Sequence, residues 1–105
     1  KMGQSEIILQ GRQATVKPGT NVVASMADGF REELQQLVQD TPESIVIDLS
    51  DVEMIDSMGI GVMIAVHNSL AKTKGLLKIV NANKNILTLF RTMRLDRHFT
   101  VEGTA

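Results

Sequence analysis

The sequence predicts a single α/β domain with a mostly parallel central sheet and helices packed on it. Two short apolar runs rich in β-branched residues, Ile45–Leu49 and Leu76–Val80, have the length and composition of buried strands. They alternate with longer segments whose apolar residues recur at helical spacing, a pattern typical of parallel sheets covered by helices. The predicted order is β-β-α-β-α-β-α-β. The 105 residues suffice for one domain with its own core, which we expect over residues 5–103.

The start of the chain predicts a hairpin followed by an amphipathic helix. Glu6–Gln10 and Gln13–Lys17 are strand candidates, and Gly11-Arg12 between them suits a tight two-residue turn. Pro18-Gly19-Thr20-Asn21 ends the second strand and offers an N-cap for a helix over Val22–Asp40. The apolar residues of this helix fall on one face: Val23, Met26, Ala27, Phe30, Leu34, Leu37 and Val38.

The rest of the chain predicts the parallel part of the sheet, with Ile45–Leu49 as its central strand. The helix that opens at Ser57 is apolar nearly all round in its first half, so we expect that half to be deeply buried. The remaining elements are a C-cap at Gly75, a strand over Leu76–Val80, a helix over Lys84–Arg94 with Asn83 as its N-cap, and a last strand over Phe99–Glu102.

Composition excludes several classes of function. The formal net charge of −1 gives no basis for binding nucleic acid or an anionic membrane surface. The chain contains no cysteine, so disulfides and thiolate metal sites are excluded. No apolar run is long enough to span a bilayer and no signal-peptide pattern leads the chain. We therefore expect a cytoplasmic protein, with residues 1–4 flexible and Lys1, which precedes Met2, a remnant of cloning.

The segment Asp56-Ser57-Met58-Gly59-Ile60-Gly61 joins a strand to a helix, at the edge of an α/β sheet where ligands and partners bind. A serine at this point is a natural N-cap, because its oxygen can accept a free amide of the first helical turn. Gly59 and Gly61 leave this turn without side chains, so a partner or an anion can approach the backbone closely. From these residues alone, Ser57 is either a structural cap or a functional residue.

This segment, after a strand that ends in Asp48-Leu49-Ser50, resembles the signature of STAS domains, the family of the anti-sigma factor antagonists. Leu76–Asn81 and the later Met93-Arg94-Leu95-Asp96 resemble the last strand–helix unit of the same family. The resemblance covers roughly Glu6 to Glu102. It implies the STAS fold, whose element order is the one predicted above.

The resemblance also implies a function and a switch. Family members bind an anti-sigma factor while the serine corresponding to Ser57 is unphosphorylated, and that partner is often a serine kinase of the histidine-kinase-like ATPase type. Phosphorylation adds roughly −1.5 to −2 charges and would end the binding, since a dianion is costly to bury in an interface. The expected partner-binding residues are Asp56, Ser57, Met58, Gly59 and Gly61, with Ser57 as the phosphoacceptor.

One stretch departs from the family pattern. Many antagonists carry an aspartate at the start of their first helix, next to the phosphorylated serine, whereas this chain has Val22-Val23-Ala24-Ser25. The alternative hypothesis is therefore a STAS subunit of a larger assembly, such as an accessory protein of an ABC transporter or a stress-signalling complex. Ser57 would then cap a docking surface without a phosphoswitch.

The residues of this loop and helix do not favour a metal site or an enzyme. Asp48, Asp51 and Asp56 surround one loop, but we expect them to accept backbone amides rather than to hold Mg²⁺. Ser57 and His67 are about ten residues apart on one helix, roughly 15 Å along its axis, which excludes a direct Ser–His pair. We therefore expect no catalytic residue, no metal and no cofactor.

Two further patterns receive a structural interpretation. Gly59-x-Gly61 lacks the third glycine of a dinucleotide-binding loop. The methionines Met26, Met54, Met63 and Met93 are core candidates by position. Met58, at the helix start, is also expected to be buried, but it would suit an adaptable partner surface if it were exposed.

Overall fold

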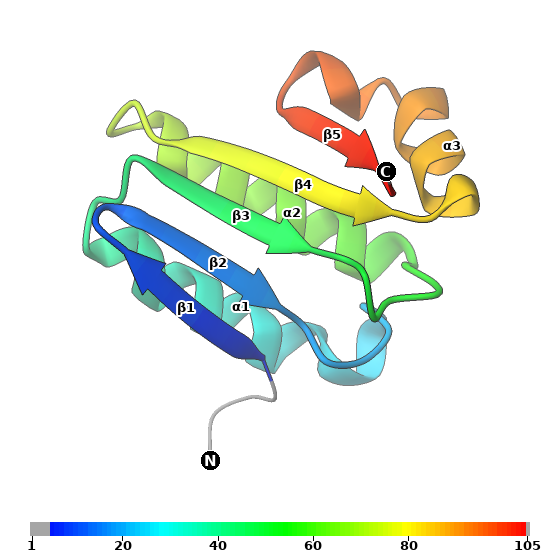
Figure 1. The fold of residues 1–105 in the computed structure, drawn as a ribbon, viewed down its shortest axis with the longest axis horizontal. Coiled ribbons are helices and arrows are strands. Elements are labelled where there is room, and N and C mark those ends of the chain that lie inside the picture. Colours follow the sequence, from blue (N-terminus) through cyan, green and yellow to red (C-terminus); the bar gives the residue numbers. More distant parts are fainter. Residues whose placement is uncertain (1–4, 105) are drawn as a thin grey trace.

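The computed structural model describes residues 5–104, and the expectations for residues 1–4 lie outside the described residues. The chain folds into a five-stranded sheet with helices against it, in the predicted order (Figure 1). The elements are β1 (Glu6–Gln10), β2 (Gln13–Lys17), α1 (Ala24–Gln39), β3 (Ser44–Asp48), α2 (Ser57–Ala71), β4 (Leu76–Ala82), α3 (Lys84–Thr92), the 3-10 helix η1 (Leu95–Arg97) and β5 (Thr100–Gly103).

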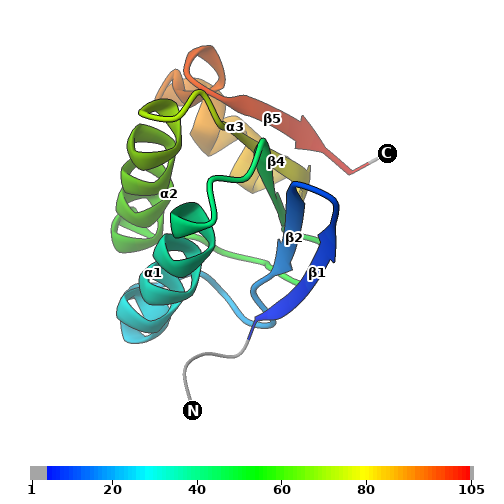
Figure 2. The ribbon, with the colours of Figure 1, turned by 90° about the vertical axis from the view of Figure 1, so that its left-hand side faces the viewer.

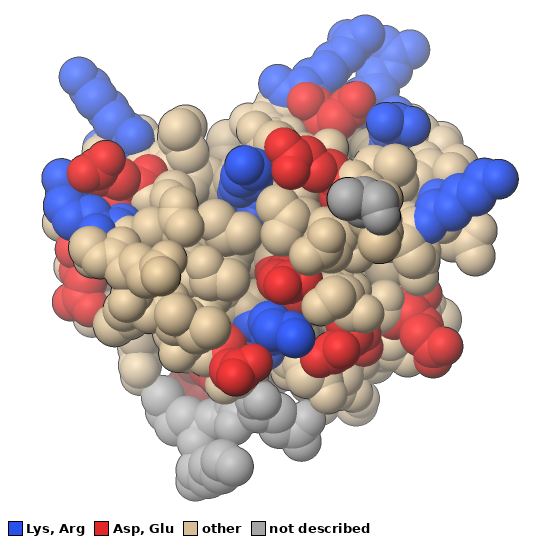
Figure 3. Space-filling view, viewed as in Figure 1, with Lys and Arg blue, Asp and Glu red and all other residues tan. Residues whose placement is uncertain are grey.

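The strands lie in the sheet in the order in which they occur in the chain. The β1–β2 pair is antiparallel and every later pair is parallel, so the predicted adjacent and parallel β3 and β4 are confirmed. Helices α1 and α2 cover one face of the sheet (Figure 2). The other face has no helix over it in Figure 1, and Figure 3 shows charged side chains interspersed with uncharged ones across it.

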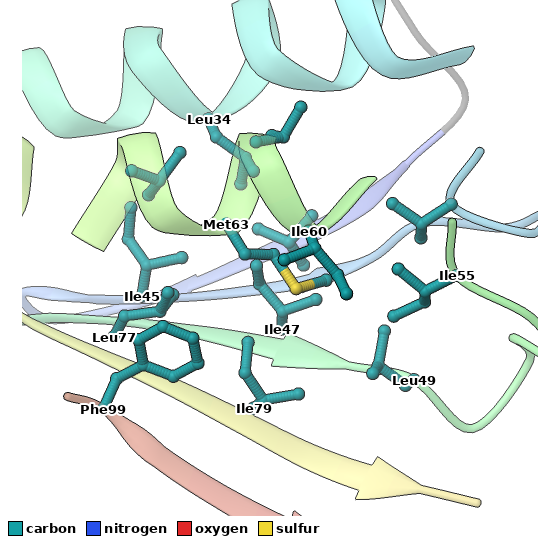
Figure 4. Close-up of a cluster of buried hydrophobic side chains, with 14 of the residues drawn as sticks. Leu34, Ile45, Ile47, Leu49, Ile55, Ile60, Met63, Leu77, Ile79 and Phe99 are labelled. Carbon is teal, nitrogen blue, oxygen red and sulfur yellow. The ribbon is translucent and has the colours of Figure 1, made fainter. Parts of the chain in front are cut away.

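The core lies between the sheet and the two long helices. Alternate strand residues point toward the helices, as the pleat requires, and Ile45 and Ile47 of β3 are fully buried there. Figure 4 shows Leu34 of α1 and Met63 of α2 on the helix side of this layer. The expectation that β3 forms the central strand of the core is therefore confirmed.

Helix α1 begins at Ala24, two residues later than predicted, and Val23 occupies its N-cap position without a side-chain hydrogen bond. The predicted cap at Thr20-Asn21 is wrong. The Asn21 side chain instead accepts hydrogen bonds from the backbone of Glu53 and Met54, at 2.8 and 3.1 Å. Val22 is held extended by a parallel bridge to Ile55, which prevents the helix from starting there.

The predicted glycine C-cap at Gly75 is also wrong. Helix α2 ends at Ala71, and the residue in the left-handed conformation is Lys74, with φ of 63°. Gly75 serves close packing instead, because a Cβ on it would lie 3.0 Å from both a Leu70 side-chain carbon and the Pro42 carbonyl oxygen. No helix within residues 5–104 is both long enough and apolar enough to cross a membrane.

Candidate functional site

The candidate site is built around the start of α2. Ser57 is the first residue of the helix and its side chain is exposed. The N-cap is Asp56, whose Oδ1 accepts a hydrogen bond from the Gly59 amide at 3.0 Å, so the prediction that Ser57 is the N-cap is wrong. Asp56 has the extended backbone of an N-cap residue, and its negative charge suits a helix N-terminus. The Ser57 hydroxyl is therefore not used as the cap.

Asp56 also joins two helices. Its Oδ2 accepts a hydrogen bond, at 2.9 Å, from the backbone amide of Ala24, the first residue of α1. The hydrogen bond from Gly59, and after it the one from Ala24, holds the pKa of the Asp56 carboxyl below its ordinary value. One carboxylate thus serves the N-termini of α1 and α2, and it compensates for the missing side-chain cap on α1.

The two glycines of the motif have different surroundings. Gly61 is exposed and a Cβ built on it would meet nothing within 4 Å. Gly59 is buried, and a Cβ there would overlap the carbonyl oxygen of Val22 and crowd a methyl group of Ile55. The expectation that Gly59 leaves the backbone open to a partner is therefore wrong: Gly59 lets α2 start close against the Val22–Ile55 bridge.

Exposed methionines surround the start of α2. Met58 has 54% of its surface exposed, and Met54 and Met93 are exposed to a similar degree. The expected burial of Met54, Met58 and Met93 is therefore wrong, whereas Met63 is fully buried as predicted. Exposed methionine side chains are flexible and polarizable, which suits binding surfaces that must adapt to a partner.

An open groove of about 390 Å³ runs beside Ser57, between α2 and α3. Its walls are mainly apolar. Ile60 and Ile64 lie one turn apart on α2, Leu89 and Met93 lie one turn apart at the end of α3, and Ile55 precedes α2. Asp56, Ser57 and Gly61 line the groove at the start of α2. The Ser57 hydroxyl therefore lies next to a mostly apolar surface that a protein partner could cover.

The other acidic candidates are separate from one another. Asp48 accepts hydrogen bonds from the Ser50 amide at 2.9 Å and from the Asn81 side chain at 3.1 Å, whereas Asp51 pairs with Lys17 at 3.5 Å. Burial alone would raise the pKa of Asp48, but these hydrogen bonds outweigh it and hold the pKa below its ordinary value. Within residues 5–104, no three His, Cys, Asp or Glu side chains are grouped to hold a metal ion.

His67 lies away from Ser57, as its position on α2 predicts. Its ring contacts the Phe99 ring, with centroids 5.4 Å apart, and the His98 ring, with centroids 6.2 Å apart. His98 and Phe99 belong to the loop that leads into β5, and none of the three rings lines the groove beside Ser57.

A match to a known protein family identifies the family of this chain. The STAS domain family matches residues 6–105. The chain belongs to the STAS domain family. The comparison with curated protein sequences finds no relative of this chain.

Solved structures share the STAS fold at low sequence identity. A Thermotoga maritima protein assigned as an anti-sigma factor antagonist is 22% identical, with a TM-score of 0.89 over 95% of this chain and 86% of that one. The anti-sigma factor antagonist SpoIIAA of Bacillus, in its phosphorylated form, is 13% identical, with a TM-score of 0.74 over 93% and 90%. A sulfate transporter family protein from Wolinella succinogenes is 12% identical, with a TM-score of 0.77 over 90% and 80%.

Two features of this STAS domain were missed by reasoning from sequence. The first is the groove beside Ser57. Its sequence signal was the distribution of apolar residues nearly all round α2, because the sheet and α1 cannot cover every face of such a helix. The second was the hydrogen bond between Asp56 and Ala24, which joins residues 32 positions apart and has no local sequence signal.

Proposed function

We propose that this STAS domain is a cytoplasmic anti-sigma factor antagonist that regulates transcription by binding, not by catalysis. In this proposal the unphosphorylated protein binds an anti-sigma factor through the start of α2 and the groove beside it. That partner is also a serine kinase of the histidine-kinase-like ATPase type, and phosphorylation of Ser57 ends the binding. The supporting observation is the exposed Ser57 hydroxyl at the first position of α2, beside the groove.

The chemistry of the groove supports a switch. A partner that covers the apolar walls of Ile60 and Leu89 would also remove water from Ser57. Phosphoserine would carry roughly −1.5 to −2 charges, beside an Asp56 carboxylate that is already ionised. Burial of this charge is costly unless basic groups meet it. The free protein tolerates the phosphate, because a helix N-terminus favours negative charge.

Asp56 also bears on the departure from the family pattern at the start of α1. Although Val23 and Ala24 bring no acid to this position, the Asp56 carboxylate lies at hydrogen-bond distance from the Ala24 amide. We infer that Asp56 supplies the acidic group that a kinase would meet between Ser57 and the start of α1.

The test uses an anti-sigma factor kinase encoded in the same genome, with wild type and Ser57 variants. We expect the kinase to transfer phosphate to wild type but not to Ser57→Ala, with mass spectrometry locating the phosphate on Ser57. Ser57→Ala should keep the affinity of wild type. Ser57→Asp should weaken binding by about 2–5 kcal/mol, or roughly thirtyfold or more. Thr100→Asp, which adds the same charge on the uncovered face of the sheet, is the matched control and should bind normally.

The second candidate is a docking subunit of a larger assembly, such as an ABC transporter or a stress-signalling complex. The shared fold of the Wolinella succinogenes sulfate transporter family protein is compatible with it. If Ser57→Asp binds its partner as tightly as wild type, with circular dichroism showing a folded protein, the phosphoswitch is refuted and the docking-subunit hypothesis replaces it.

A further inference from the structure

The edge strand β1 carries an unusual run of exposed apolar side chains. Ile7, Ile8 and Leu9 follow one another and expose 38%, 48% and 66% of their surfaces. Proteins usually protect such an edge with charged side chains, proline or a bulge. The one charge of β1, Glu6, stands at its first residue, the strand has no proline, and all five of its residues pair with β2 in regular register. The opposite edge strand, β5, is short, contains Glu102 and has an irregular register with β4.

The apolar layer of the core extends to this edge of the sheet, where the residues of β1 on the helix side are apolar as well. On the helix side of the sheet, Ile7 lies opposite Val16, which is followed across the sheet by Ile47 and Ile79. Leu9 lies opposite Ala14 in the next row. On the uncovered face, Figure 3 shows an uncharged area over β1 and β2, where Ile8 lies opposite Thr15. Both faces of β1 therefore offer apolar contacts to another strand.

The hairpin geometry determines which backbone groups of β1 are free. Gly11 has φ of 60° and opens a two-residue turn, so its flanking residues Gln10 and Gln13 form a hydrogen-bonded pair. Hydrogen-bonded and non-hydrogen-bonded pairs alternate along an antiparallel ladder. The backbone groups of Ile8 therefore bond to β2, whereas the N–H and C=O groups of Ile7 and Leu9 face away from β2. Because β1 is the edge strand of the sheet (Figure 2), these groups point outward.

We propose that β1 pairs with β1 of a second copy of this chain, antiparallel, about a two-fold axis that passes beside Ile8. In this register Ile7 of each copy lies opposite Leu9 of the other, so the four outward backbone groups of each strand have partners. The register is self-complementary in charge as well. Glu6, the single charged residue of β1, lies opposite the neutral Gln10, at the turn end of the partner strand where Arg12 follows.

Ile8 occupies the critical position of this dimer. It meets its own copy across the axis as a non-hydrogen-bonded pair, the type in which side chains approach most closely. The dimer joins two sheets into one. It leaves the groove between α2 and α3 uncovered, because no residue of the edge strand β1 lines that groove. The proposal is therefore independent of the function proposed for Ser57.

Two five-residue strands bury less area than a standard stable interface, so we expect a weak dimer with a dissociation constant between about 1 µM and 1 mM. Sedimentation equilibrium of the full chain, up to about 1 mM, measures it. Ile8→Lys and Ile8→Glu should each weaken dimerisation at least tenfold, because like charges face one another at the axis. An equimolar mixture of the two variants should dimerise again, since lysine then faces glutamate.

Leu76→Lys is the matched control. Leu76 exposes 69% of its surface and lies on β4, away from the β1 edge, so the variant loses an exposed apolar side chain and gains a charge without touching the axis. It should dimerise as wild type does. A monomeric wild type at 1 mM, or an Ile8→Lys variant as dimeric as wild type, would overturn the proposal. So would a mixture of the two Ile8 variants that stays monomeric while circular dichroism shows both to be folded.

Discussion

The replacement Gly59→Ala tests how closely α2 packs against the Val22–Ile55 bridge. A Cβ at Gly59 would overlap the Val22 carbonyl oxygen, with Val22 Cγ1 at 2.8 Å and Ile55 Cγ2 at 3.0 Å. The carbonyl cannot shift easily, because it also accepts a hydrogen bond from the Asp56 amide at 3.2 Å. Relief of the overlap therefore requires movement of the helix start or of the bridge.

The magnitude follows from two opposing effects. Overpacking typically costs about 1–3 kcal/mol, and a clash with a fixed backbone atom belongs at the upper end of that range. Alanine is a better helix former than glycine by roughly 1 kcal/mol, which offsets part of the cost. We expect Gly59→Ala to lower the free energy of unfolding by about 2 kcal/mol, measured by urea denaturation.

Gly61→Ala is the matched control on the same helix. A Cβ at Gly61 meets nothing within 4 Å, so the variant should gain up to about 1 kcal/mol from helix propensity alone. The two glycine variants should thus change stability in opposite directions. If Gly59→Ala is as stable as Gly61→Ala, the close approach of α2 to Val22 is wrong.

Three further measurements test the fold and the site. Ile47→Ala, in the centre of the core, should cost about 2–5 kcal/mol in urea denaturation, whereas the exposed Ser57→Ala should stay within about 0.5 kcal/mol of wild type; equal losses would contradict the placement of the core. Because the folded state lowers the pKa of Asp56, its contribution to stability should be present above the unfolded-state pKa of roughly 3.9 and lost as pH falls through the folded-state pKa. The stability difference between wild type and Asp56→Asn should therefore shrink at acid pH, and a difference independent of pH would argue against an ionised double cap. Met58→Ala should leave stability nearly unchanged but weaken binding to the proposed anti-sigma factor partner, and unchanged affinity would remove Met58 from the proposed surface.

The sequence predicted most of the fold because local signals agreed with one another. Periodicity located the strands and helices, and the Gly11-Arg12 turn predicted the hairpin. The boundaries were less accurate where a distant segment decided them. Val22 carries no local signal against helix formation, yet its bridge to Ile55 delays the start of α1.

The candidate site divides in the same way. The position of Ser57 at the junction of a strand and a helix was predictable, since β-branched residues before it and helical spacing after it are properties of neighbouring residues. The role of Asp56 was not, because its second hydrogen bond reaches the start of α1. Met93 and Leu89 had the spacing of a buried helix face, yet they line an open groove.

The sequence by itself determined the α/β order, the burial of the central strands and the location of the serine, because spacing along the chain controls which side chains share a face. Only the tertiary structure decided that Asp56 caps two helices, that Gly59 packs where Gly61 is open, and that β1 ends an apolar layer at an exposed edge. These features depend on distances between segments far apart in the chain. The physical reason is that hydrogen-bond partners, steric overlap and exposure are properties of the packed molecule.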